Sequence, residues 1–178
     1  MPPEARNRRS FPFLARFVGL LIVFYFLVAW RPINDAVIVP FTAAIASVSG
    51  AILNALGESV VVSGTEIRAP GFAVNIENGC NGIETVLLFC AAVLAFPASA
   101  RRRAIGFVVG FFAIELLNFV RVLSLFWIGH HYPSFFSSSH TVVWQSIVVL
   151  FGVLLFLVWA IWRPVQQTAP ARSPGRKG

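Results

Sequence analysis

Long apolar stretches, separated by short polar ones, dominate the pattern of this chain. Four of these stretches reach the roughly 20 residues that a membrane-spanning helix requires, two of them only when their flanking residues are included. The pattern therefore predicts a single membrane-embedded domain of residues 1–165 with four spans, at approximately 13–30, 80–97, 104–129 and 141–162.

A fifth apolar segment, residues 36–56, is diluted by Pro40 and several Ser, Thr, Gly and Asn residues. If it does not span, the N-terminal basic cluster, Arg101 to Arg103 and the basic tail all fall on the cytoplasmic side, in line with the positive-inside rule. That arrangement accounts for eleven of the fourteen Lys and Arg residues. We therefore expect residues 36–56 to form an interfacial or re-entrant helix on the outer face, with both termini cytoplasmic.

The first apolar run is preceded by basic residues, as in a signal peptide, but it is followed by Trp30-Arg31-Pro32. This is not the small-x-small pattern of a cleavage site, so we expect a retained anchor. Residues 59–76 contain β-branched runs broken by Ser-Gly and Ala-Pro-Gly, which predict a small outer β-hairpin or pair of short strands. The Pro- and Gly-rich residues 166–178 are expected to form a disordered basic cytoplasmic tail.

The expected fold is an all-α integral membrane helical bundle with a small extracytoplasmic β-hairpin and an interfacial or re-entrant helix. Composition agrees, since 57% of the residues are hydrophobic, 12% are charged and the mean hydropathy is +0.78. A soluble domain of this size could not bury so much apolar surface, so the lipid bilayer is the expected partner. A nucleic-acid partner is not expected, because the Phe and Trp residues lie inside apolar runs and not on a basic face.

Arg121 is the most costly residue of the predicted spans, because a centrally placed arginine costs about 2.5 to 3.5 kcal/mol on insertion scales. Asn118 lies one helical turn before it, and Glu115 falls close to the same face. Arg121 could snorkel outward or form a structural ion pair with Glu84 or Glu115, and this explanation competes about evenly with a functional one.

Cys80 stands at the outer end of the second predicted span, where Asn78 or Asn81 could cap the helix. A thiol in the first turn faces the positive end of the helix dipole, so we expect its pKa to be lowered. Glu84 follows four residues later on the same face. Cys90 lies about 15 Å further along the helix, too far for a disulfide, and is interpreted as a small hydrophobe.

His140 begins the last span and is expected at the outer surface, near the level of Cys80. A thiol, a base and a cation from three helices are the minimum set for acyl transfer. A metal site is not expected, since one Cys with scattered His residues lacks the usual ligand spacing. A buried structural network remains an alternative, although it would not require a thiol.

Three motifs in this order carry a resemblance to a known family: "NGCNGIE" at the start of one span, "NFVRVLSL" near the end of the next, and His140 at the start of the last. The chain resembles the exosortase/archaeosortase family of membrane transpeptidases, and its short length resembles the compact exosortase H type. The resemblance implies Cys80, Arg121 and His140 as catalytic residues. Asn118, Glu84 and Asn81 are assigned to substrate binding, and no cofactor is expected.

The resemblance further implies a cysteine transpeptidase or protease in the bacterial cytoplasmic (inner) membrane, with its active site facing outward. Its substrates would be secreted proteins whose C-terminal sorting signal combines a short motif, a transmembrane helix and a basic cluster. The enzyme would cut at the motif and pass the new C-terminus to an acceptor. Two alternatives stay open: a non-enzymatic membrane assembly or transport subunit with a polar cavity, and a lipid- or phosphate-processing enzyme, which leaves Cys80 without a role.

Overall fold

The computed structural model describes residues 3–162 and, within them, the side chains of residues 12–136 and 142–162. The predicted tail, residues 166–178, lies outside this part of the chain. The helical elements in chain order are α1 (Pro3–Ala29), α2 (Arg31–Ile33), the π-helix η1 (Asn34–Ile38), α3 (Val39–Ala55), α4 (Ile83–Ala95), α5 (Ala100–His131), α6 (Pro133–Ser138), the π-helix η2 (Ser139–Trp144) and α7 (Gln145–Ile161).

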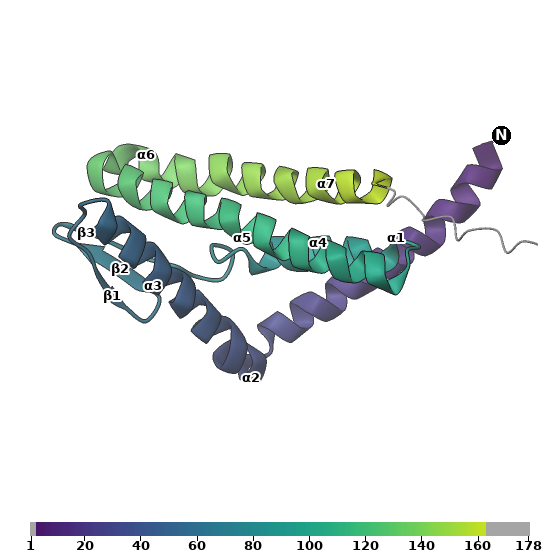
Figure 1. Cartoon of the computed structure of the whole chain (residues 1–178), viewed down its shortest axis with the longest axis horizontal. Helices are drawn as coiled ribbons and strands as arrows, with labels where there is room; N and C mark the ends of the chain where they lie inside the picture. The colour runs from purple at the N-terminus through teal and green to yellow at the C-terminus, as the bar shows by residue number, and fades with distance from the viewer. Residues whose placement is uncertain (1–2, 163–178) are drawn as a thin grey trace, which may run out of the picture.

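Helix α5 is the longest helix of the structure, and its 32 residues extend over about 48 Å. Helix α7 lies antiparallel beside it along most of its length, while α4 accompanies its first half and α3 with the β-sheet its second half (Figure 1). Helix α1 packs against α4. The start of α1, the α4–α5 connection and the end of α7 lie at one end of the molecule, and the sheet and α6 at the other.

The chain bends sharply between α1 and α3, which form the two arms of a V in Figure 1. Trp30 adopts an extended conformation, and Pro32 follows within the first turn of α2, where a missing N–H costs no helical hydrogen bond. Elements α2, η1 and α3 then form one continuous helical stretch of 25 residues, Arg31–Ala55. The interfacial or re-entrant position expected for residues 36–56 stays a prediction.

Four helices in the described part of the chain are long and apolar enough to cross a membrane: Pro12–Ala29, Arg31–Ala55, Ala100–His131 and Val142–Ile161. The span predicted over 80–97 is helical only from Ile83 to Ala95, a length of about 20 Å against a hydrocarbon core of about 30 Å. Its helix begins late because Gly79 and Gly82 adopt left-handed conformations, with φ of 91° and 82°.

Strands were expected within 59–76, and the structure contains three where a hairpin or strand pair was predicted. Strands β1 (Val61–Ser63), β2 (Glu66–Ala69) and β3 (Phe72–Asn75) form an antiparallel sheet in the order β1-β2-β3. The register pairs Val62 with Ile67 and Ile67 with Val74. Ile67 is fully buried against α3 and α5, so the sheet covers one end of the helices.

Two hydrophobic cores lie at the two ends of α5. One joins α3, the sheet and the second half of α5 around Leu53 and Phe126. The other joins α4, α7 and the first half of α5 around Phe89 and Trp159. Gly106 and Gly110 allow α5 to pack closely against α7 and α4, because an added Cβ at these positions would collide with Trp159 and Phe89.

Apolar side chains on the outward faces of the helices remain exposed, as expected for contact with lipid. Phe112 and Leu116 of α5 are 67% and 68% exposed, although the same helix buries Ile114 completely. Four long apolar helices with such outward faces identify a multi-pass membrane protein.

Candidate active site

A row of three polar side chains on α5 lies between the two hydrophobic cores. Glu115 is 5% exposed, Asn118 is 0% exposed and Arg121 is 2% exposed. Their spacing of three residues places them on one face of the helix, as the sequence predicted. The apolar residues that flank the row, Ile114 and Val122, belong to different cores. A buried polar row at this position is costly, so it points to a specific role.

Arg121 connects this row to the segment between β3 and α4. Its Nη1 donates a hydrogen bond to the Gly79 carbonyl oxygen at 3.2 Å, and its Nη2 donates to the Cys80 Sγ at 3.8 Å. Among the side chains that the structure describes, no carboxylate lies within 4.0 Å of Arg121. The ion pair with Glu84 or Glu115 considered as an alternative is therefore not formed, and Arg121 is too buried to snorkel.

The segment carrying Cys80 is held by its own backbone and by Asn81. The Cys80 N–H donates to the Glu77 carbonyl oxygen at 2.9 Å. Asn81 is fully buried, donates from Nδ2 to the Thr42 Oγ1 of α3 at 2.9 Å, and accepts from the Ile83 N–H at 3.2 Å. Asn81, the residue directly after Cys80, therefore joins the start of α4 to α3.

The expected effect of the helix dipole on Cys80 was wrong, because the thiol is not in the first helical turn. Helix α4 begins at Ile83, three residues later. Burial raises the pKa of Cys80, the Arg121 guanidinium opposes this rise, and the carboxylates of Glu84 and Glu77 add to it. A neutral thiol is therefore the resting form near pH 7, and a base is needed to activate it.

Glu115 and Asn118 are the unsatisfied members of the polar row. Neither oxygen of Glu115 and neither polar atom of Asn118 makes a hydrogen bond of good geometry to a described residue, although the Asn118 side chain lies close enough to interact with the Glu115 carboxylate. The Glu115 carboxylate packs against Gly82, where an added Cβ would lie 2.7 Å from its Oε1. Buried polar groups without partners are rare in proteins, so these atoms mark a place prepared for a further polar group.

Glu84, His140 and Cys90 are the other residues considered from the sequence. Glu84 lies in the first turn of α4, within electrostatic range of Cys80 and of Tyr25 in α1, but not on a helical face shared with Cys80. The backbone of His140 belongs to η2, and its side chain lies outside the described part of the structure. Cys90 is half-buried in α4 and forms no disulfide with Cys80.

Among the described residues, no group of three or more His, Cys, Asp or Glu side chains lies close enough together to hold a metal ion. His130 and His131, at the end of α5, pack against aromatic rings: His130 stacks on Phe126 and His131 on Trp127. The polar groups of the site that the structure describes are a thiol, a guanidinium, carboxamides and the Glu115 carboxylate.

Sequence reasoning missed three residues that shape the site. Gly82 leaves the space that Glu115 occupies, Gly79 supplies the carbonyl that Arg121 binds, and Thr42 anchors Asn81. The repeated Asn-Gly pairs on either side of Cys80 were the available signal, because Gly supplies the left-handed conformations seen at both positions. Thr42 carried no such signal, since only the packing of α3 brings it close.

The fold and the site together define a class: a helical membrane protein in which a buried arginine contacts a cysteine just before a short helix. The family model described as transmembrane exosortase (Exosortase_EpsH) matches residues 8–161, and the chain belongs to this family. No curated protein and no solved structure matches the chain.

Proposed function

We propose that this protein is a membrane cysteine transpeptidase or protease of the compact exosortase H type. It cleaves the C-terminal sorting signal of secreted proteins at the outer face of the bacterial cytoplasmic membrane and transfers them to an acceptor. The observation that carries the proposal is the contact of the buried Arg121 with the Gly79 carbonyl and the Cys80 thiol, with no carboxylate from the described side chains within 4.0 Å to neutralise it.

An arginine in this position suits transition-state stabilisation better than it suits folding. Leaving a buried guanidinium without a counter-ion is unfavourable for stability. The same positive charge becomes favourable when negative charge develops nearby, first on the thiolate and then on the oxygen of a tetrahedral intermediate. Family membership agrees with this interpretation, since exosortases are generally cysteine transpeptidases.

Catalysis requires a base, because burial raises the pKa of Cys80. His140 takes the thiol proton as the sulfur attacks the scissile carbonyl carbon, and Arg121 holds the resulting oxyanion. The carbon–nitrogen bond then breaks, and the leaving amine receives the proton from His140. Attack of the acceptor or of water on the thioester releases the product and regenerates the thiol.

The helix register supports His140 in this role. Helices α5 and α7 are antiparallel, and Arg102 donates to the carbonyl oxygens of Trp159 and Ala160 at their far end. Moving nineteen residues along α5 from Arg102 leads to Arg121, and moving nineteen residues back along the chain from Trp159 leads to His140. The two positions are therefore expected at one level of the bundle.

The distribution of basic residues supports the proposed orientation. The N-terminal basic cluster lies at the start of α1, and Arg101 to Arg103 lie at the start of α5. Both helix starts lie at one end of the molecule, away from the sheet (Figure 1). By the positive-inside rule this end faces the cytoplasm, and the sheet faces outward.

The experiment that tests the proposal compares two cysteine variants in cells. Its substrate is a secreted protein of the same cell that ends in a short motif, one apolar helix and a basic cluster. We expect Cys80→Ala to abolish C-terminal processing of this protein and Cys90→Ala to preserve it, as measured by the mass of the mature C-terminus. Equal processing in the two variants would leave the non-enzymatic assembly or transport subunit as the better description.

A further inference from the structure

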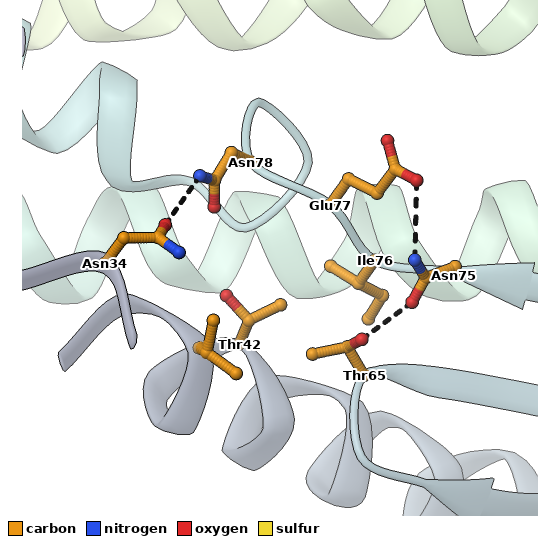
Figure 2. A pocket seen from close by; sticks show the side chains of 8 residues that line it. Asn34, Thr42, Thr65, Asn75, Ile76, Glu77 and Asn78 are labelled. Atoms are coloured by element: carbon orange, nitrogen blue, oxygen red, sulfur yellow. Dashed lines mark hydrogen bonds between the residues drawn. The ribbon is translucent and has the colours of Figure 1, made fainter. Parts of the chain in front are cut away.

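A polar pocket of about 350 Å³ lies beside the segment that carries Cys80. Three parts of the chain form it: the end of the α1–α3 bend with Asn34, the sheet end with Thr65 and Asn75, and the connecting residues up to Asn78 (Figure 2). Its volume lies in the range of small-ligand pockets. Nothing in the proposed catalytic chemistry uses it.

Hydrogen bonds order the polar side chains around this pocket. At one side, Asn78 Nδ2 donates to Asn34 Oδ1 at 2.9 Å. At the other, Thr65 Oγ1 donates to Asn75 Oδ1 at 2.7 Å, and Asn75 Nδ2 contacts Glu77 Oε1 at 3.4 Å (Figure 2). Each carboxamide nitrogen has two N–H groups, so each retains a donor for a ligand.

The pocket and the nucleophile share one short stretch of chain. Asn78, which lines the pocket, precedes Cys80 by two residues, so their Cα atoms are at most about 7 Å apart. Thr42 also lines the pocket and accepts the hydrogen bond of Asn81, the neighbour of Cys80. A peptide bound at the thiol therefore reaches the pocket with its second or third residue, since an extended chain advances about 3.3 Å per residue.

The chemistry of the pocket wall selects for an uncharged peptide. Three carboxamides can donate to peptide carbonyls from their second N–H group. The two threonine hydroxyls already donate their protons, Thr42 to the Ile38 carbonyl oxygen and Thr65 to Asn75 Oδ1, so they can only accept from peptide N–H groups. Glu77 is the charged residue among those that line the pocket, and it would repel an acidic side chain. No lysine or arginine from the described residues lines the pocket to attract one.

We propose that this pocket binds the sorting motif two or three residues from the scissile bond, and that it selects uncharged hydrogen-bonding side chains over acidic ones. The proposal rests on the function proposed above, because it assigns the recognition element of that same site. It names the substrate class as an extended peptide that carries Ser, Thr, Asn or Gln at the pocket position.

The test measures binding without chemistry, in the full chain carrying Cys80→Ala and embedded in lipid nanodiscs. The probe is a synthetic peptide library with six varied positions before an apolar helix and a Lys-Arg cluster. We expect retained peptides to be enriched in Ser, Thr, Asn or Gln at one position and depleted of Asp and Glu there. Thr65→Val and Asn34→Ala should weaken binding of an enriched peptide by about tenfold.

The charge of Glu77 provides the sharper comparison. Glu77→Gln should remove the depletion of acidic residues, whereas Glu58→Gln, which removes the same charge outside the pocket, should leave it unchanged. Equal retention of all peptides, or selection that none of the pocket variants alters, would overturn the proposal. Binding is measured in a variant without the thiol, so it does not depend on catalysis. Selective binding of peptides together with an absence of cleavage by the wild-type protein would contradict only the proposed activity. Cleavage by the wild-type protein together with an absence of selective binding would contradict only the proposed role of the pocket.

Discussion

Two arginines of the same helix, Arg102 and Arg121, are held in opposite ways. Arg102 Nη2 donates to the Trp159 and Ala160 carbonyl oxygens at 2.6 and 2.9 Å, and its guanidinium lies 4.8 Å from the centre of the Trp159 ring. These carbonyls end α7 and lack donors within their own helix. Arg102 therefore completes a helix end and fastens α7 to α5.

Arg121 has no helix end to complete. It contacts the Gly79 carbonyl and the Cys80 sulfur, which belong to a short irregular segment. It also lies one turn from Asn118, whose side chain makes no hydrogen bond of good geometry to a described residue. The comparison teaches that burial of a cation does not itself indicate function. What distinguishes the two sites is whether the polar groups around the cation are already satisfied.

The largest expected effect comes from replacing the two guanidinium groups by ammonium groups. Arg121→Lys keeps the charge but loses the planar arrangement of donors, so we expect substrate processing to fall by about 100-fold with an unchanged unfolding midpoint. Arg102→Lys should keep the processing rate. A similar loss of activity in both variants would remove the functional distinction between the two arginines.

A methyl group at Gly82 should disturb the structure around Cys80 and Arg121 without affecting the contacts of Arg102. Gly82→Ala combines a left-handed backbone with a Cβ 2.7 Å from Glu115 Oε1. Gly71→Ala is the matched control, because Gly71 has a φ of 79° and open space around it. Each change costs about 1 to 2 kcal/mol of stability for the backbone. Only Gly82→Ala should also reduce the rate of substrate processing, by about tenfold, which corresponds to about 1.4 kcal/mol in the activation barrier. Equal processing rates in the two variants would show that the contact of Gly82 with Glu115 is unimportant.

At the other end, Arg102→Ala should lower stability and leave the chemistry intact. It removes the charged donor of two carbonyls, and each such bond contributes about 1.5 to 3 kcal/mol. The expected result is a lower midpoint of thermal unfolding in detergent, with an unchanged rate of Cys80 alkylation at a temperature where the protein stays folded. An unchanged midpoint would show that Arg102 does not fasten α7.

The smallest effect is expected on thiol reactivity, measured with iodoacetamide in a Cys90→Ala background. Because the pKa of Cys80 is raised by burial and lowered by Arg121, the alkylation rate should still increase between pH 7 and pH 9. Arg121→Gln should raise this pKa further and slow alkylation several-fold at pH 8, as expected for losing a nearby positive charge. Arg102→Gln should not. A rate that is already constant from pH 7 upward would contradict the raised pKa.

The sequence predicted three of the four long apolar helices, those near 13–30, 104–129 and 141–162, and the polar row of α5, because both depend on local patterns. It did not predict the long helix Arg31–Ala55 as a candidate span, because polar residues dilute its apolar run. Apolar runs define helices in lipid, and a spacing of three residues aligns Asn118 with Arg121. Cys80 and Arg121 were singled out from the sequence by residue type and by the family resemblance, and the hydrogen bond between their side chains shows that the fold brings them together. The family model that matches the chain covers all three motifs.

The start of α4 and the pocket were not predictable in this way. An apolar run beginning at Ile83 can be extended in sequence to Cys80, and only the left-handed Gly82 ends the helix sooner. The pocket joins Asn34, Thr65 and Asn78, which are far apart in the chain. No local periodicity connects such residues, because the packing of the α1–α3 bend against the sheet end brings them together.

The most direct test of the central claim is to trap the acyl intermediate on the enzyme. Wild-type protein, Cys80→Ala and Cys90→Ala are mixed with the anchored substrate, quenched in acid and digested, and the peptides are sequenced by mass spectrometry. The account predicts a thioester on the peptide containing Cys80, cleavable by hydroxylamine, in the wild-type and Cys90→Ala proteins and absent from Cys80→Ala. An adduct on another residue, or processing that continues in Cys80→Ala, would contradict it.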